Sequence, residues 1–197
     1  MTTLVSKSRC YECGGTMNGQ KGAYRYRECG LTSVTLKDIL VYRCANCGAE
    51  VPEIPAAGLL HRMIAFRLVC KKKLLTGSEA RFLRKFCGYS VNELAEILGS
   101  SKQVIWRWEK EGYGPDTERV VRFLVVAKLT RELVGAPSSI LKNVSVERLI
   151  GDLEETLKML DENKTRASEN YEISPEEIAK FSTGVGEESN ELVAVLQ

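Results

Sequence analysis

Four of the seven cysteines in this 197-residue chain stand in two matched pairs, Cys10 with Cys13 and Cys44 with Cys47. Each pair reads Cys-x-x-Cys-Gly, which places two thiolates one tight turn apart and puts a glycine where the chain must bend sharply. Two such pairs, thirty residues apart, are typical of a tetrahedral four-sulfur zinc site. Cys10, Cys13, Cys44 and Cys47 are therefore the predicted ligands of one structural Zn²⁺ per chain.

The competing explanations for these cysteines are disulfides or a redox dithiol. No run approaches the ~18 apolar residues of a membrane span, and the segment 1–9 has no apolar signal-peptide core. We therefore expect a cytoplasmic, reducing location, where closely spaced cysteines bind metal more often than they pair. Cys29, Cys70 and Cys87 are predicted to be small, half-buried thiols, and the single histidine, His61, to be a packed or surface side chain rather than a fifth ligand.

Catalysis is not expected, because a four-cysteine site leaves no open position for a substrate water and only one histidine is present to act as a base. The net charge of +2 hides an asymmetry. Residues 1–75 hold 12 Lys and Arg against 5 Asp and Glu, residues 76–135 hold 10 against 8, and residues 136–197 hold 6 against 13. A basic front and an acidic end indicate different partners for the two ends.

Helix signals are dense after residue 55. Apolar spacing predicts a connecting helix over 56–73 that ends in a basic run, Lys71 to Lys73, expected to be solvated or to contact phosphate. The Thr76–Glu79 pair fits a capping box, Ser90 fits a second cap, and Gly88 and Gly99 fit turns. The predicted helices that follow cover residues 76–87, 91–98, 101–110, 117–134 and 145–162, with a short one starting at Ser174-Pro175.

These elements predict an α+β protein: a small zinc-bound module that contains β-strands, an all-α helix-turn-helix domain, and an acidic helical tail. The zinc-binding module is expected over 1–54, the connecting helix or linker over 55–75, the helix-turn-helix domain over 76–135, and a partly flexible tail over 136–197.

The segment 91–110 predicts two helices that cross at a sharp turn. Ile105 and Trp108 would plug the core beneath the second helix, which leaves its polar face outward. Lysine, glutamine and arginine are side chains that contact base edges and phosphates, although an ordinary helical bundle would also have a polar face. The predicted DNA-binding residues are Asn92, Ser101, Lys102, Gln103, Trp106, Arg107 and Lys110.

Residues 77–129 resemble the Cro/CI-type (Xre-like) DNA-binding domain, through Phe82-Leu-Arg-Lys, Gly88-Tyr-Ser-Val-Asn-Glu-Leu-Ala, Leu98-Gly99 and Arg107-Trp-Glu. That resemblance implies base contacts by Lys102, Gln103 and Arg107 and binding as a two-fold homodimer to double-stranded, palindromic DNA. Asn92 stands where a glutamine is usual in that family.

The cysteine pairs followed by this domain, over about residues 8 to 130, resemble the CxxCG zinc finger/helix-turn-helix family that includes the MqsA-type antitoxins. The resemblance implies a transcriptional autorepressor that is the antitoxin of a bacterial toxin–antitoxin pair. The alternative is a stand-alone regulator without a toxin. A toxin is expected to bind the zinc module, where Tyr24, Arg25 and Tyr26 would be exposed, or the acidic tail.

Overall fold

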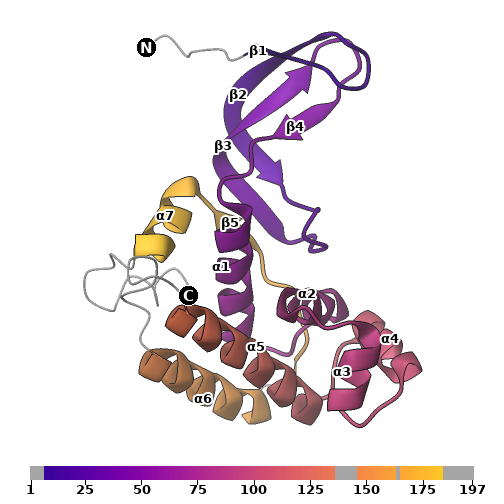
Figure 1. The fold of residues 1–197 in the computed structure, drawn as a ribbon, viewed down its shortest axis with the longest axis vertical. Coiled ribbons are helices and arrows are strands. Elements are labelled where there is room, and N and C mark those ends of the chain that lie inside the picture. The colour runs from indigo at the N-terminus through magenta and orange to yellow at the C-terminus, as the bar shows by residue number, and fades with distance from the viewer. Residues whose placement is uncertain (1–6, 136–145, 163–164, 184–197) are drawn as a thin grey trace.

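The computed structural model describes residues 7–135, 146–162 and 165–183. Parts of the predicted 1–54 and 136–197 segments therefore lie outside the described residues. The described chain forms a sheet of five strands and seven helices, arranged with the sheet at one end and most of the helices at the other (Figure 1). None of the described helices is long and apolar enough to cross a membrane. The mixed α and β composition confirms the fold class at this coarse level.

The sheet is built around one long central strand, β3 (Val34–Cys44). On one side β3 pairs with β2 (Thr16–Arg25), which in turn pairs with the short β1 (Lys7–Arg9), all antiparallel. The other edge of β3 is shared: its last residues pair antiparallel with β4 (Glu50–Pro52), and its first residues pair parallel with β5 (Tyr171–Ile173). The sequence did not predict β5, which brings the C-terminal part of the chain into the N-terminal sheet.

A single apolar core joins the sheet to the helices. On β3, Val34, Leu36 and Val41 are almost completely buried, and α1 (Ala57–Val69) runs from the sheet toward the other helices with Leu60 and Leu68 inside the same cluster (Figure 1). The cluster continues into α2 (Gly77–Cys87), α3 (Val91–Ile97), α4 (Lys102–Glu111) and α5 (Pro115–Gly135). The half of the sheet that lies nearer the helices is therefore stabilised by burial against them.

Helix ends follow the predicted capping residues. Thr76 with Glu79 and Ser90 with Glu93 form complete capping boxes, so that each side chain satisfies a backbone N–H of the first turn. The Ser101 side chain accepts from the N–H of Val104 at the start of α4. Gly88 ends α2 with φ of 85°, a conformation that glycine adopts without steric cost. Helix α5 begins at Pro115 rather than at residue 117.

The C-terminal part of the chain packs back against the helices and the first residues of β3. Helix α6 (Val146–Glu162) packs against α5, and α7 (Pro175–Thr183) packs against α1. Between them the Arg166 guanidinium donates to the carbonyls of Leu75 and Tyr113. Further along, Glu172 pairs with Lys37 and Glu177 pairs with Arg67. Two acidic side chains of the predicted tail are therefore engaged by cations of the same chain.

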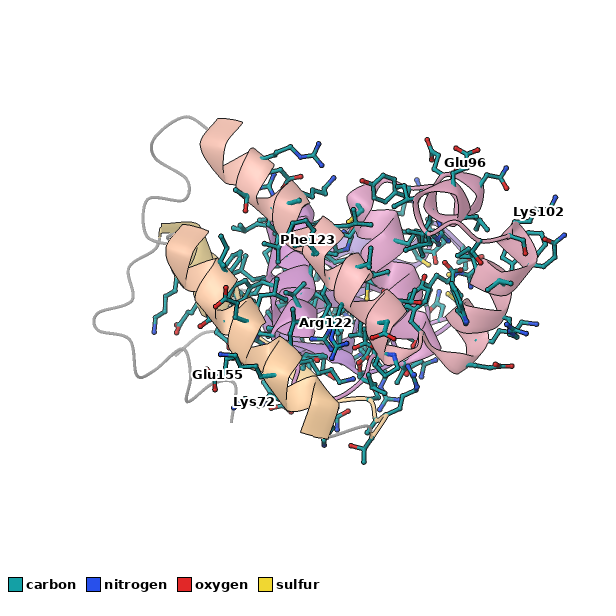
Figure 2. All side chains as sticks on the ribbon, turned by 90° about the horizontal axis from the view of Figure 1, so that it is seen from below. Lys72, Glu96, Lys102, Arg122, Phe123 and Glu155 are labelled. Atoms are coloured by element: carbon teal, nitrogen blue, oxygen red, sulfur yellow. The ribbon has the colours of Figure 1, made fainter. Side chains whose placement is uncertain are left out.

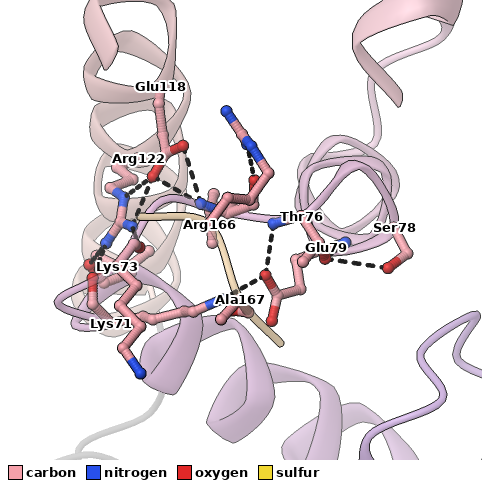
Figure 3. Close-up of polar contacts among 11 residues, drawn as sticks. Lys71, Lys73, Thr76, Ser78, Glu79, Glu118, Arg122, Arg166 and Ala167 are labelled. Carbon is pink, nitrogen blue, oxygen red and sulfur yellow. Dashed lines mark hydrogen bonds and ion pairs between the residues drawn. The ribbon is translucent and has the colours of Figure 1, made fainter. Parts of the chain in front are cut away.

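A buried ion pair closes the junction between α1, α2 and α5 (Figure 3). Arg122 and Glu118 lie one turn apart on α5, both fully buried, with 2.7 Å between Nη2 and Oε1. Arg122 also donates to the carbonyls of Val69, Lys71 and Lys73, while Glu118 accepts from the N–H of Leu75. These contacts satisfy the end of α1 and the linker that follows it.

Lys71 belongs to this junction and not to a solvated basic run. Its ammonium is fully buried, pairs with Glu79 at 2.6 Å, and donates to the carbonyl of Ala167 (Figure 3). The expectation that residues 71–73 form an outward basic end was wrong for Lys71, because the Glu79 carboxylate also caps α2 and draws the lysine inward. Lys72 remains exposed.

Replacing Arg122 with alanine should strongly destabilise the fold. The change leaves the Glu118 carboxylate buried without its cation and frees three carbonyls, so we expect a loss of about 3–5 kcal/mol in the free energy of unfolding. Chemical denaturation monitored by circular dichroism measures it. The matched control is Arg119→Ala, which removes a partly exposed arginine of the same helix that pairs with Asp116 and should cost under about 1 kcal/mol. Equal losses for the two variants would contradict the assigned role of Arg122.

Candidate metal centre and nucleic-acid interface

The two cysteine pairs meet at the end of the sheet that lies away from the helices. The first pair occupies the turn between β1 and β2, and the second begins at Cys44, the last residue of β3, and ends at Cys47 in the turn to β4. The register of β2 on β3 places Met17 opposite Cys44, so the two turns lie side by side. Sequence spacing alone predicted the four ligands, and strand pairing supplies the reason that they converge.

Both turns have the same backbone construction. In the first, the N–H of Cys10 donates to the carbonyl of Gly15, and the N–H of Gly14 donates to that of Cys10. The second repeats these bonds with Cys44, Ala49 and Gly48. Gly14 and Gly48 adopt φ of 71° and 74°, which requires glycine for an unstrained turn. The glycine after each cysteine pair therefore has the steric role predicted for it.

All four sulfurs lie within 4.8 Å of one another. The Sγ atoms of Cys10 and Cys47 are 3.5 Å apart, as are those of Cys13 and Cys44. A tetrahedral ion with metal–sulfur distances of about 2.3 Å holds its ligands roughly 3.8 Å from each other. The cluster therefore fits one four-coordinate metal ion.

The electrostatics of the cluster also suit a cation. The backbone N–H groups of Cys47 and Asn46 lower the pKa of the Cys44 thiol to about 6, so the metal-binding thiolate is populated at neutral pH. The N–H of Ala49 lowers the pKa of the Cys47 thiol, but the sulfurs of Cys10 and Cys13 outweigh it and raise that pKa to about 12. Four adjacent thiols cannot all ionise without a compensating positive charge, and a bound metal ion supplies that charge.

The metal centre has its own small core. Cys10 and Cys44 are buried with Met17, and Tyr42 and Ala49 pack against them, whereas Cys13 and Cys47 are exposed. This cluster is separate from the main apolar core. Cys29, Cys70 and Cys87 are half-buried and are not part of the four-sulfur group. His61 lies in the main core region, where its Nε2 is 2.8 Å from the Tyr26 hydroxyl and its ring meets the edge of Phe82.

The predicted DNA-binding residues lie together on α3, α4 and the turn between them. Asn92, Ser101, Lys102, Gln103, Arg107 and Lys110 are all exposed, and Trp106 is 51% exposed. Figure 2 shows Glu96 and Lys102 at the end of the helical region that is opposite α6 and Glu155. Among the residues that the structure describes, none of the three cations Lys102, Arg107 and Lys110 has a carboxylate at ion-pair distance.

The orientation of α4 is fixed from its other face. Ile105 is fully buried, and half-buried Trp108 meets Tyr113 edge-on at 5.6 Å between ring centroids. The nearly buried carboxylate of Glu109 pairs with Arg84 of α2. A Cβ on Gly77 would lie 2.6 Å from the carbonyl oxygen of Glu109, so α2 and α4 cross at a distance that only glycine permits. The sequence did not predict the roles of Arg84, Glu109 and Gly77, because a charge pair between separate helices leaves no local pattern.

One surface prediction was wrong. Tyr26 is buried beneath the sheet at 4% exposure, and Tyr24 is half-buried, which leaves Arg25 as the exposed member of the three. Tyr24 donates to the carboxylate of Glu28. The alternation of a strand would have placed the two tyrosines on one face, but it could not show that helix α1 covers that face.

Searches of protein-family models, of curated proteins and of solved structures find no match to this chain.

Replacing Cys44 with serine should remove the bound metal and unfold the cysteine end of the sheet. The change deletes one of four ligands and the thiolate with the lowered pKa, while the main core, which does not include this cluster, is left intact. Metal content is measured by elemental analysis, and the two cysteine turns are followed by hydrogen exchange. We expect loss of about one metal ion per chain and fast exchange of residues 10–15 and 44–49.

The control is Cys87→Ser, which alters a half-buried thiol outside the cluster and should keep the metal. If Cys44→Ser retained a full equivalent of metal, the four-sulfur assignment would fail.

Proposed function

We propose that this chain is a sequence-specific DNA-binding transcriptional regulator, with α3 and α4 acting as a helix-turn-helix unit and α4 as the recognition helix. The observation that carries the proposal is the composition of the outer face of α4. Lys102, Gln103, Trp106 and Arg107 are exposed on it, while Ile105 on the opposite side is fully buried. A polar, cationic face on a helix held rigidly from behind is suited to the major groove of DNA.

Gln103 and Arg107 are the side chains proposed to contact base edges. They lie four residues apart, which sets them on the same face of α4 about one turn from each other. An arginine can donate two hydrogen bonds to guanine, and a glutamine can pair with adenine in the same bidentate manner. The absence of an ion-pair partner for Arg107 among the described residues leaves its guanidinium available for such a contact.

Lys102 and Asn92 are proposed to contact the phosphate backbone. The Lys102 ammonium lies 5.9 Å from the centre of the Trp106 ring, which holds it at the N-terminal edge of the polar face. Asn92 is exposed near the start of α3. Ser101 and Lys110 flank the two ends of α4 and complete the surface. Contacts of this kind position a protein on DNA without reading its sequence.

Zn²⁺ is the metal proposed for the four-cysteine site, because thiolate sets of this kind suit it and a closed set of four sulfurs gives it a structural role. When bound, zinc would neutralise the clustered thiolates and tie the two cysteine turns together. Cys10, Cys13, Cys44 and Cys47 would occupy all of its coordination positions. This arrangement favours a regulator over an enzyme.

The biological role that we propose is autorepression by the antitoxin of a bacterial type II toxin–antitoxin pair, acting in the cytoplasm. The order of the cysteine pairs and the proposed helix-turn-helix unit supports it through the family resemblance. The alternative is a stand-alone regulator with the same DNA-binding unit and no toxin partner. The two differ in whether a neighbouring gene encodes a toxin that the chain neutralises.

Replacing Arg107 with alanine should weaken binding to the cognate operator strongly and binding to random DNA little. Loss of one bidentate base contact costs about 1–3 kcal/mol. Lys102→Ala should instead weaken both and reduce the slope of log K against log salt by about one. Fluorescence anisotropy over a salt series, with the upstream region of the gene as cognate DNA, measures both effects.

The control is Lys158→Ala, which removes an exposed cation of α6 and should change neither affinity. An unchanged footprint for Arg107→Ala would remove α4 from the proposed reading role.

Co-expression with the product of an adjacent toxin-like gene tests the antitoxin role. The full chain is the right reagent, because the sheet and helices share one core and a fragment would expose it. We expect the chain to relieve the growth arrest and to co-purify with the toxin. Arg25→Glu on the sheet and Glu154→Lys on α6 should locate the contact, since each reverses one exposed charge at one of the two expected surfaces. Unrelieved arrest and no co-purification would favour the stand-alone regulator.

A further inference from the structure

A short C-terminal segment that begins at Thr165 lies against the backbone that precedes α2. The N–H of Leu74 donates to the carbonyl of Thr165 at 3.0 Å, and Leu74 forms a parallel bridge with Arg166. On the other side of Arg166, the carbonyl of Ala167 accepts from the buried ammonium of Lys71 (Figure 3). The segment is therefore anchored on both sides of Arg166, which fixes the region that this side chain can reach.

The Arg166 guanidinium ties the start of α2 to the end of α4. One of its terminal nitrogens donates to the carbonyl of Leu75, directly before the Thr76 cap of α2. The other donates to the carbonyl of Tyr113, two residues after the end of α4. A guanidinium suits this bridge because its donors point in fixed directions from one plane, whereas an ammonium acts as a single point charge.

Gly112 makes room for the guanidinium at the end of α4. Its φ of 97° favours glycine for steric reasons. A Cβ at this position would also collide with the Arg166 guanidinium. The N–H of Gly112 donates to the carbonyl of Trp108 at 2.6 Å. The arginine of the C-terminal segment therefore lies directly against the last turn of α4.

The bridge is connected to the outer face of α4 through two aromatic rings. Tyr113, whose carbonyl Arg166 holds, is completely buried, and its ring meets Trp108 edge-on at 5.6 Å between ring centroids. Trp108 directly follows Arg107, the side chain proposed to read a base edge. A contact that fixes the backbone at Tyr113 therefore also restrains the inner face of α4 beside Arg107.

We propose that Arg166 is a positioning residue for DNA reading: it holds the end of α4 so that Arg107 meets a base edge in the correct orientation. Arg166 itself is half-buried, and both of its terminal nitrogens donate within the chain. The inference rests on the proposed function of α4, and it gives the C-terminal segment a part in DNA recognition. Orientation matters because hydrogen bonds weaken steeply when they are misaligned.

Hydrogen exchange of the full chain without DNA tests the bridge alone. Arg166→Ala removes both donors, so we expect the Gly112 amide to exchange at least about tenfold faster, while the amides of α3 exchange as in the wild type. Arg166→Lys keeps the charge but holds one carbonyl at a time, and its exchange should be intermediate.

The matched control is Arg131→Ala, which removes an exposed arginine whose Nε donates to a carbonyl of its own helix, α5. It should leave the exchange of α4 unchanged. An Arg166→Ala variant whose Gly112 amide exchanges at the wild-type rate would overturn the proposal, whatever the chain does with DNA.

Affinities for the upstream region of the gene and for random DNA test the consequence for reading. A misaligned α4 loses base-edge contacts and keeps its phosphate contacts, so Arg166→Ala should weaken cognate binding about tenfold and random binding less than about twofold. The slope of log K against log salt should stay the same, because Arg166 neutralises no phosphate. Partial unfolding would weaken both affinities in the same proportion, and a direct phosphate contact would reduce the slope by about one. Either result would contradict the positioning role.

A double variant tests whether Arg166 acts through Arg107. If Arg166→Ala works by misaligning Arg107, its effect should largely disappear once Arg107 is already alanine. The double variant should then bind the cognate DNA no more than about threefold more weakly than Arg107→Ala alone. Two losses that multiply in full would show that the arginines act independently, which the proposal forbids. If the wild type itself did not prefer its upstream DNA, the proposed function would fail, whereas the exchange experiment would still decide the bridge.

Discussion

The buried guanidinium of Arg122 is the contact on which the arrangement of the helices depends. It is fully shielded from solvent, pairs with the carboxylate of Glu118, and donates to three carbonyls at the end of α1 and in the linker that follows. A buried charge of this kind is costly unless its geometry is complete. Helix α1, which follows the sheet, and helix α2, which follows the linker, are therefore held to α5 in one relative position.

A second constraint, between α2 and α4, fixes the position of α4 relative to these helices. Gly77 opens α2 directly after the linker, and its lack of a side chain allows the backbone of Glu109 to lie against it. The Glu109 carboxylate then reaches Arg84, which lies about two turns further along the same face of α2. One residue of α4 provides both the close backbone contact and the ion pair. These contacts of the inner face therefore fix the direction in which the outer face of α4 points. The base-reading role proposed for α4 requires such a fixed orientation, since hydrogen bonds to base edges tolerate little misalignment.

Local signals were sufficient to predict much of this molecule. Capping boxes at Thr76 and Ser90, glycine turns and the cysteine spacing each depend on a few neighbouring residues, and the corresponding helices and the four-sulfur cluster were predicted correctly. The missed features depend on residues far apart in sequence. Strand β5 has only three residues and needs β3 to exist, and Lys71 is buried because Glu79 and Ala167 meet it in space. Neither leaves a periodic pattern. The DNA-binding residues remain a prediction; the structure shows that each of them is exposed, on α3, on α4 or in the turn between them.

The long strand β3 links two differently stabilised ends of the protein. Its first eight residues, from Val34 to Val41, include four side chains of the main core: Val34, Leu36, Ile39 and Val41. Its last residue, Cys44, belongs to the separate metal cluster. Loss of metal therefore removes the stabilisation of one end only, while burial against α1 continues to hold the other. The fraying should stop where β3 meets the main core at Val41, which leaves α4 and its supporting contacts in place.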